Sequence, residues 1–449
     1  MLGLLALALA LAPPAAPAAA VPAAAPQGDP VPSSRTLTLD DALQAARSRH
    51  PQIRQASAAS AAASARVEEA LAPLLPQVTG SGSYQRTTAN YTSRPGSLPS
   101  SISGSSGTES WDSFNYFNFG VNAGVLLYDF GQTRGRWRSS QASLAAQEES
   151  ERTALSLVLF AARTSYFQAR AARGLVDVAR QTLANQRKHL DQTEGFVEVG
   201  TQAPIALAQT RTAVANARVQ LIAAENGYAT AKAQLNQAMG VEGPTDYDVA
   251  DAPAPEVEGE EGTAGALLGE AVKARPELVT FARQIEAQVL TIQSVQGAYG
   301  PSLGASTGLT EAGVSMSQLT WNWNALLSLS VPIFQGGQTR AQVREAKANL
   351  ESLRAQAELE RQQIGFEVEQ ARLAVRAAKE TVVAAGEALT NGREQLRLAE
   401  GRFETGVGSI LELSDAQVAL TSAGQQAVQA EYTLAQARAQ LLKALGRDR

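Results

Sequence analysis

The sequence predicts an α+β membrane protein in which a few strands of each chain join a shared β-barrel and long antiparallel helices form a coiled-coil tube. Three observations support this fold class. The chain contains an internal duplication, its strand-like segments alternate between apolar and polar residues, and its proline-free segments repeat apolar residues every seven positions. Strict alternation is typical of β-strands, and sustained heptads are typical of coiled coils.

The composition argues against ordinary globular cores and several classes of function. Alanine and glutamine are abundant in the 449 residues, and only 5% of the residues are aromatic. Such a chain favours extended helices with thin, closely packed seams. The net charge of −5 gives no reason to expect a nucleic-acid partner. The absence of cysteine excludes disulfides, thiolate metal sites and a cysteine nucleophile.

The N-terminal segment, residues 1–27, reads as a secretory signal peptide. Its apolar run from Leu4 to Leu11 is too short to span a bilayer and is followed by alanine and proline residues that suit cleavage. Beyond this segment the sequence contains no long apolar stretch. We therefore expect the mature chain to enter a membrane only through strands.

One structural unit occurs twice in the chain. The segment Gly131–Arg134 recurs as Gly337–Arg340, and at the same offset Gly200 corresponds to Gly406. The first repeat, 28–240, reads as a helix, a β-hairpin over 77–128, a long helix over 131–198 and a returning helix over 203–239. The second repeat, 262–446, reads as a helix, a β-hairpin over 301–333, a long helix over 337–404 and a returning helix over 409–446. Residues 241–261 are rich in Pro, Glu and Asp, which predicts a solvated linker between the repeats.

The second strand of each hairpin carries one apolar and one polar face. Apolar residues occupy every second position, and mostly asparagine, serine, threonine and glycine stand between them. Runs of about ten residues suit a tilted membrane strand, and aromatic pairs stand toward one end of each strand, as in an interfacial girdle. We therefore predict that the apolar face contacts lipid. The predicted lipid-facing residues are Phe117, Phe119, Val121, Val125, Leu127, Leu319, Trp321, Trp323, Leu327 and Leu329.

A soluble amphipathic sheet that covers a hydrophobic core would show the same alternation. The rest of the sequence offers little for such a face to cover. Four strands cannot close a barrel alone, and an open strand edge is not tolerated in lipid. Several chains must therefore contribute four strands each.

The proline-free segment between Gly131 and Gly200 predicts a helix of about 65 residues, roughly 100 Å long at ~1.5 Å per residue. Its heptads, and the alternating leucine and alanine layers of the returning helix, predict closely packed antiparallel pairs. Gly200 followed by Pro204 predicts one short turn, and Ser409 is a candidate N-cap after the other. A rod-like coiled-coil scaffold explains these seams equally well, but it does not explain the strands.

Two acids, Glu412 and Asp415, stand three residues apart on one face of the first turns after Ser409. A favourable interaction with the helix dipole would by itself explain acids at this position.

The mature chain resembles the outer-membrane efflux protein family, the TolC-like ducts of Gram-negative bacteria. The sharpest local match is Thr405–Ala416, which is similar to the family's tip motif, where two aspartates form rings that narrow the periplasmic entrance. The resemblance implies a trimer whose chains together form a twelve-stranded transmembrane β-barrel, continuous with a periplasmic α-helical coiled-coil barrel. It assigns Glu412 and Asp415 to the periplasmic constriction, where stacked acids repel anions and attract cations.

The chain departs from the family pattern at two positions in the tips. Gly408 stands where some members carry a basic residue that helps to lock the closed state. Ala206 stands at the best-matching position for a further gating acid in the first repeat. The closed-state contacts of the best-known members therefore do not transfer directly to this chain.

The resemblance also implies partners and a location. A periplasmic adaptor protein would dock on the tips, at Gly200, Thr201, Gly406, Val407 and Gly408, and an inner-membrane pump of the RND, MFS or ABC type would supply the energy. The chain would lie in the outer membrane, with its helical part in the periplasm.

The residues give no indication of an enzyme or of a bound cofactor. The sequence has no phosphate-binding loop, and its two histidines, His50 and His189, are far apart in the chain and do not suggest a metal site. We expect a passive export duct, with efflux favoured over protein secretion, and the cargo is not encoded in the pattern. A non-porous coiled-coil envelope scaffold and a ligand-binding module remain as alternatives.

Overall fold

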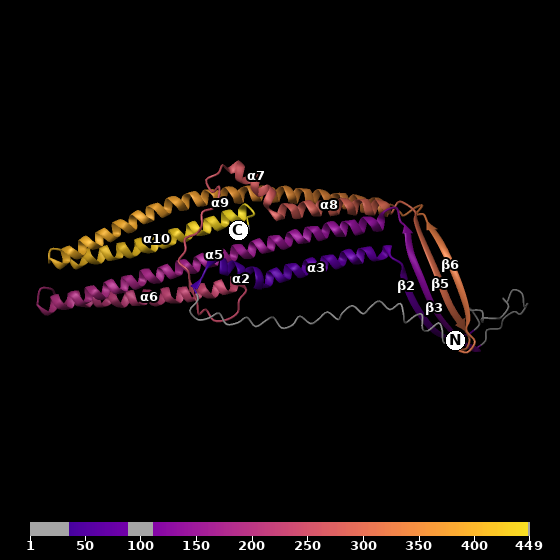
Figure 1. Ribbon diagram of the computed structural model, residues 1–449, viewed down its shortest axis with the longest axis horizontal. Coiled ribbons are helices and arrows are strands. Elements are labelled where there is room, and N and C mark those ends of the chain that lie inside the picture. The colour runs from indigo at the N-terminus through magenta and orange to yellow at the C-terminus, as the bar shows by residue number, and fades with distance from the viewer. Residues whose placement is uncertain (1–35, 89–110, 448–449) are drawn as a thin grey trace, which may run out of the picture.

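The computed structural model of the chain describes residues 36–88 and 111–447. In it, a four-stranded sheet at one end continues into a bundle of long helices, and two helical hairpin tips form the other end (Figure 1). The predicted signal peptide, 1–27, and most of the longer loop of the first hairpin lie outside the described residues.

The two repeats follow the same order of elements. The first repeat consists of β1 (Thr36–Leu37), α2 (Leu39–Arg49), α3 (Pro51–Leu71), the 3-10 helix η1 (Ala72–Leu74), β2 (Gln77–Thr88), β3 (Ser113–Tyr128), α5 (Gln132–Glu198) and α6 (Pro204–Met239). Strand β4 (Asp248–Val249) lies between the repeats, and the second repeat consists of α7 (Ala264–Ala274), α8 (Pro276–Gly297), β5 (Ser302–Gly313), β6 (Thr320–Ser330), α9 (Gln338–Glu404) and α10 (Ile410–Ala444).

A glycine follows the returning helix in both repeats, and the backbone conformation and close packing at this position explain why. Gly240 and Gly446 have φ values of 68° and 71°, which L side chains rarely adopt. Each one also lies against the junction between two short helices of its own repeat. A Cβ on Gly240 would lie 2.6 Å from the Cα of His50, and a Cβ on Gly446 would lie 3.0 Å from the carbonyl carbon of Ala274.

The four long strands form one antiparallel sheet in the order β2-β3-β5-β6. The strand pair β3-β5 joins the two repeats, with Val121 opposite Leu309. Among the described residues, β2 and β6 each pair with one neighbour only, so both outer edges of the sheet are free. The face that carries Val121 also carries Trp323, which lies opposite Leu309. Glu311 lies on this face too, between Phe119 and Trp321, at the end of the sheet remote from the helices.

Two of the predicted lipid-facing residues lie in settings that alternation did not predict. The register of β3 shifts between Leu126 and Tyr128, so Tyr128, and not Leu127, lies opposite Leu303. Leu127 is exposed within this bulge, and a one-residue bulge reverses the parity of the positions beyond it. Leu319 precedes β6, which begins at Thr320.

The helices α5 and α9, with 67 residues each, form the long axis of the molecule. Helix α6 packs against α5, α10 packs against α9, and α5 and α10 join the two hairpins. The seams consist of small and medium apolar residues, as the heptads predicted. Buried examples are Ala162, Ala169, Val176 and Leu183 of α5, Val368, Val375, Leu396 and Phe403 of α9, and Ala416, Ala423, Ala430 and Ala437 of α10.

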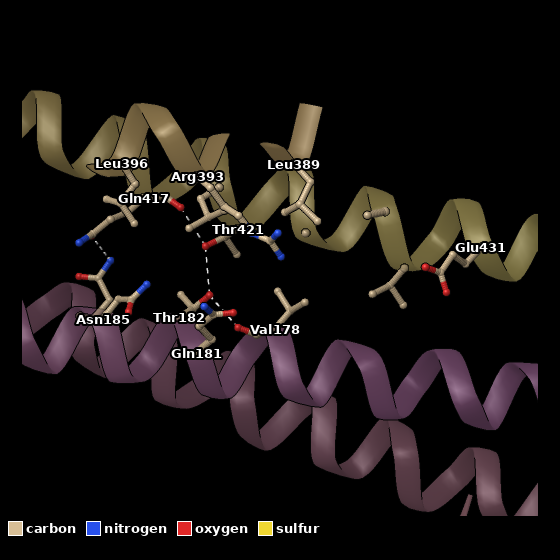
Figure 2. Close-up of a pocket in the computed structure, with 15 residues that line it drawn as sticks. Val178, Gln181, Thr182, Asn185, Leu389, Arg393, Leu396, Gln417, Thr421 and Glu431 are labelled. Atoms are coloured by element: carbon tan, nitrogen blue, oxygen red, sulfur yellow. Dashed lines mark hydrogen bonds between the residues drawn. The ribbon is translucent and has the colours of Figure 1, made fainter. Parts of the chain in front are cut away.

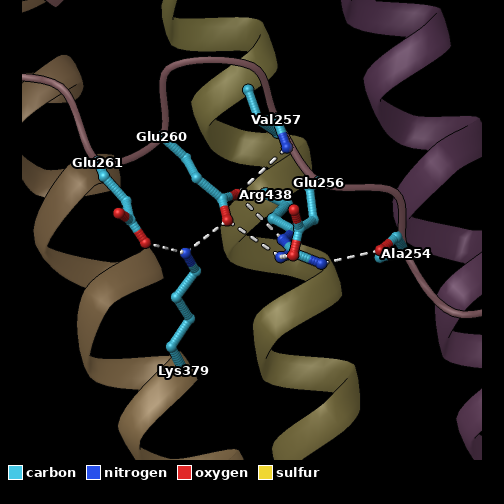
Figure 3. A network of polar contacts seen from close by, with 7 residues as sticks. All are labelled: Ala254, Glu256, Val257, Glu260, Glu261, Lys379 and Arg438. Carbon is cyan, nitrogen blue, oxygen red and sulfur yellow. Dashed lines mark hydrogen bonds and ion pairs between the residues drawn. The ribbon is translucent and has the colours of Figure 1, made fainter.

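Residues 241–261 are not a free linker but a segment that packs across the helices, and we call them the belt. Tyr247, Val249 and Val257 are buried, and β4 pairs in parallel with β1. Glu260 forms a two-pronged ion pair with Arg438 of α10, at 3.0 and 3.1 Å (Figure 3). Acidic residues of the belt, whose abundance predicted a solvated linker, thus partly form ion pairs with the helices. The apolar residues between them pack against the helices and hold the backbone in place.

Within the described ranges, no helix combines the length and the apolarity that crossing a membrane would require.

Candidate functional site

The two helical tips share the same backbone turn. Helix α5 ends before Gly200 and α9 ends before Gly406, and both glycines are left-handed, with φ values of 77° and 75°. In the second tip the carbonyl of Arg402 accepts hydrogen bonds from the N–H groups of Val407 and Gly408, at 3.0 and 2.8 Å. Such bonds satisfy carbonyls that a helix end leaves free.

In the first tip the carbonyl of Phe196 accepts the corresponding hydrogen bonds. Its donors are the N–H groups of Thr201 and Gln202, at 2.9 and 3.2 Å. Residue for residue, Phe196 of the first repeat therefore matches Arg402 of the second.

The tips expose apolar side chains to solvent. Val199 and Ile205 flank the first turn, and Val407 and Leu411 flank the second; each of the four is at least two-thirds exposed. Of the residues that the sequence assigned to adaptor docking, Gly200, Thr201, Gly406 and Val407 are exposed and Gly408 is half-buried. Val199, Ile205 and Leu411 were not among the predicted docking residues, although an apolar residue beside a tip glycine can be recognised in the sequence.

Glu412 and Asp415 lie on the first turns of α10, but their surroundings differ. The Oγ of Ser409 caps this helix and accepts a hydrogen bond from the backbone N–H of Glu412 at 3.1 Å. The Oε1 of Glu412 lies 3.1 Å from the Nε of Arg402, across the hairpin. Asp415 is exposed and, in the part of the chain that the structure describes, has neither a hydrogen bond nor an ion pair through its side chain.

The sequence pattern does not indicate Arg402 as a site residue. It stands one turn before Gly406, and in a helical hairpin a residue there faces the first turn of the returning helix. Recognising Arg402 therefore requires the geometry of the hairpin, which the repeat pattern alone does not give.

The two departures from the family motif have structural explanations. A Cβ at Gly408 would lie 3.0 Å from the Cβ and the carbonyl carbon of Arg402, so a side chain there would be crowded. Ala206 is only 7% exposed, and burying a carboxylate at that position would cost free energy because the carboxylate would lose its hydration.

Successive side chains of α5 contact the second hairpin near the tips. The rings of Phe196 and Phe403 meet edge to face, with their centroids 5.6 Å apart. One to two turns further from the tip, His189 is almost fully buried, with its Nε2 3.3 Å from the Oε1 of Glu400 and its Nδ1 3.0 Å from the Oε1 of Gln192. Burial lowers the pKa of His189, and the contacts with Gln192 and Glu400 oppose that shift.

Further contacts between the hairpins, farther from the tips, join α5 and α10. Gln186 donates a hydrogen bond to Gln417, and the hydroxyl groups of Thr182 and Thr421 lie 3.1 Å apart. These polar pairs line a groove of about 220 Å³ between α5, α9 and α10 (Figure 2). The interface between the hairpins is therefore more polar than the seams within them.

No group of three or more His, Asp or Glu side chains among the described residues is arranged to hold a metal ion.

Together, the amphipathic sheet, the long helical bundle and the two exposed tips define the class of outer-membrane channels that continue into a helical duct. Residues 42–241 and 267–447 match the model of the family described as outer membrane efflux protein. The chain belongs to this family.

Several curated proteins are similar to the chain. The pyoverdine export outer membrane protein OpmQ of Pseudomonas aeruginosa is 26% identical over 349 residues, which cover 77% of this chain and 73% of OpmQ. The probable efflux pump outer membrane protein TtgC of Pseudomonas putida is 24% identical over 395 residues, which cover 84% of this chain and 76% of TtgC. The cation efflux system protein CusC of Escherichia coli is 24% identical, and that match spans 51% of this chain and 50% of CusC.

Solved structures show the same fold. The crystal structure of CusC has a TM-score of 0.76 and 21% identity and covers 91% of this chain and 92% of that chain. The outer-membrane channel OprN has a TM-score of 0.77 and 22% identity, with 91% and 89% covered. The open state of the MtrE outer membrane channel of Neisseria gonorrhoeae has a TM-score of 0.73 and 21% identity, with 91% and 89% covered. The family resemblance read from the tip motif is thus confirmed, and so is the fold class of the single chain.

Proposed function

We propose that the chain is one subunit of a homotrimeric, passive export duct that crosses the outer membrane and extends through the periplasm. The observation that carries this proposal is a four-stranded amphipathic sheet with two free edges, attached to two helices of 67 residues each, which extend far beyond the sheet. An unpaired strand edge is not stable in lipid, so identical chains complete the barrel. Three such sheets give twelve strands around a wet lumen.

The apolar face of the sheet contacts outer-membrane lipid in this proposal. Phe117 and Phe119 of β3 and Trp321 and Trp323 of β6 stand toward the end of the sheet that is remote from the helices, where they form an interfacial girdle. Val121, Val125, Leu327 and Leu329 continue the face toward the helices, with Leu127 in the bulge and Leu319 before β6. Glu311 lies at the level of the girdle, where charge costs little in a membrane barrel.

The helical tips form the periplasmic entrance, with Glu412 and Asp415 at its constriction. Supporting this assignment, both carboxylates lie on one face of α10 at the end of the bundle farthest from the sheet. The exposed apolar residues around Gly200 and Gly406 offer a docking surface for a periplasmic adaptor protein. An inner-membrane pump of the RND, MFS or ABC type supplies the energy, because the chain carries no recognisable nucleotide-binding loop.

Efflux of small molecules or ions is favoured over secretion of polypeptides. Proteins similar to this chain are named for pyoverdine export, cation efflux and toluene efflux. The chain is not an enzyme in this proposal, and substrates move through the lumen by diffusion.

The proposal is tested by single-channel recording from purified protein in a planar lipid bilayer. We expect discrete, cation-selective channels, and we expect the Glu412→Ala/Asp415→Ala variant to lose cation selectivity. Channels whose selectivity is the same in the variant would leave the duct intact and remove the acids from the constriction. Folded, inserted protein that passes no current, either as wild type or as the variant, would favour the scaffold alternative.

A further inference from the structure

We propose that Arg402 determines the ion selectivity of the entrance by neutralising Glu412, so that Asp415 alone supplies the net charge of each chain at the constriction. This inference rests on the proposed function, in which Glu412 and Asp415 line the periplasmic entrance. In the trimer, the ring of Glu412 side chains is then neutralised and the ring of Asp415 side chains remains charged, so the two acidic rings are not equivalent.

The contacts of the three side chains differ as this assignment requires. The Nε of Arg402 lies 3.1 Å from the Oε1 of Glu412, and the two side chains are 56% and 42% exposed, so the pair remains at the surface. Asp415 is exposed and has no described partner. A close ion pair acts at a distance as a dipole, whose field falls off faster than that of a single charge, and salt screens what remains beyond about 8 Å. A passing ion therefore experiences Asp415 far more strongly than Glu412.

The backbone of the tip holds Arg402 in place. Its carbonyl accepts the N–H groups of Val407 and Gly408 at 3.0 and 2.8 Å, so the turn is built around this residue. Gly408 lies close to this residue, and a Cβ at 408 would lie 3.0 Å from the Cβ of Arg402.

The first repeat provides an internal comparison. Its tip folds into the same turn around the carbonyl of Phe196, but the residues that correspond to Arg402 and Glu412 are Phe196 and Ala206. The turn therefore does not need an arginine–glutamate pair in order to form. The pair is an addition to the second tip, and its consequence there is electrostatic.

The assignment predicts a pattern of charges that substitutions can test. With formal charges, Arg402, Glu412 and Asp415 sum to one negative charge per chain. Arg402→Gln makes this two, Glu412→Gln makes it zero, and the Arg402→Gln/Glu412→Gln double variant restores the wild-type value. Asp415→Asn also makes it zero. If the two acids acted independently of Arg402, Glu412→Gln would lower selectivity just as Asp415→Asn does, but Arg402→Gln would change nothing.

The experiment measures reversal potentials of these variants in planar bilayers under a potassium chloride gradient. We expect Arg402→Gln to raise the ratio of cation to anion permeability roughly threefold and Glu412→Gln to lower it by a similar factor, which is the scale of one charge a few ångströms from the ion path in salt water. The double variant should match the wild type. Arg397→Gln serves as the matched control, because Arg397 pairs with Glu394 within α9 and lies about 140° around the helix from Arg402; its selectivity should stay that of the wild type.

Two results would overturn the inference, and each is distinct from failure of the duct itself. If Asp415→Asn lowers selectivity but Arg402→Gln leaves it unchanged, Arg402 does not set the charge, although the entrance is correctly placed. If Arg397→Gln shifts selectivity as much as Arg402→Gln does, the effect is not specific to the pair with Glu412. If no variant, including Asp415→Asn, alters selectivity in channels that conduct, the location of the constriction is itself wrong.

Discussion

His189 is a nearly fully buried histidine between α5 and α9, and burial lowers its pKa. A histidine whose pKa is lower in the folded chain stays neutral there, while the unfolded chain takes up a proton below the ordinary value of 6.5. The stability that depends on the neutral imidazole is therefore present above pH 6.5 and is lost as the pH falls through and below that value.

We expect the thermal unfolding temperature in detergent to fall between pH 7 and pH 5, and His189→Gln to reduce this dependence. Circular dichroism at 222 nm would follow the unfolding. His50 caps α3 and has a lowered pKa as well, but it is much less buried. The His50→Asn variant, which keeps a capping side chain, should therefore retain most of the pH dependence. A His189→Gln protein that is as sensitive to pH as the wild type would contradict this role.

Gly135 tests the close packing of α5 against α8. A Cβ at this position would lie 2.8 Å from the Cβ of Ser294, whereas Gly195 of the same helix has nothing within 4 Å of such an atom. We expect Gly135→Ala to lower the free energy of unfolding by about 1–3 kcal/mol through overpacking. Gly195→Ala should instead be neutral or raise it by up to about 1 kcal/mol, because alanine favours the helix. Equal stabilities of the two variants would argue against the contact.

At the scale of elements, the belt joins the two repeats at the middle of the bundle. Arg170 of α5 bridges Asp251 of the belt and Glu431 of α10, at 2.8 and 2.9 Å. Toward its C-terminal end the belt is held by Glu260, which contacts Arg438 and lies 2.7 Å from Lys379 (Figure 3). Although burial opposes it, the contacts with Arg438 and Lys379 hold the pKa of Glu260 below its usual value.

Arg438→Ala should release the belt from α10. The variant leaves a buried carboxylate with only the partly exposed Lys379 as a cation, and breaking a buried pair costs about 3–5 kcal/mol when one partner is removed. We expect a loss toward the lower end of that range and faster proteolysis within 241–261. Lys379→Ala should cost less, because Arg438 keeps both of its contacts with Glu260. A belt that resists protease equally in all three proteins would show that these ion pairs do not hold it.

The elements that could be predicted from the sequence are those set by local periodicity and by glycine. The predicted helices over 131–198 and 337–404 begin within one residue of α5 and α9 and end with them, because Gly131, Gly200 and their counterparts mark both ends. Contacts between distant segments leave no such periodic signal. The packed belt, the bulge at Leu127 and the ion pair between Arg402 and Glu412 each depend on which segments meet in space, so the sequence pattern did not contain them.

At the scale of the whole molecule, the duplication predicts how neighbouring chains pair. Strand β6 corresponds to β3 and β2 corresponds to β5, since Val78 lies opposite Ala123 just as Leu303 lies opposite Leu329. The pairing of β3 with β5 inside one chain is therefore a template for the pairing of β6 with β2 of the next chain.

This template specifies a register between chains. Inside the chain, Asn122 of β3 lies opposite Gly308 of β5. The corresponding residues are Ser328 of β6 and Ser83 of β2, which we expect to face each other across the boundary between two subunits. Inside one chain they stand on opposite edges of the four-stranded sheet, which are roughly 14 Å apart across the strands at ~4.8 Å per strand. They also differ in level, because the row of paired residues that starts at Ser83 reaches β6 at Thr320, eight residues before Ser328, so they cannot meet inside one chain.

Disulfide cross-linking of the Ser83→Cys/Ser328→Cys variant tests most directly whether identical chains close the barrel. The natural chain has no cysteine, so only the introduced pair can react. We expect oxidation of the membrane-inserted variant to produce covalent trimers on a non-reducing gel, while a Thr79→Cys/Ser328→Cys control, displaced along the edge, remains monomeric. Absence of any link between chains, or equal linking in the control, would contradict a barrel completed by copies of this chain.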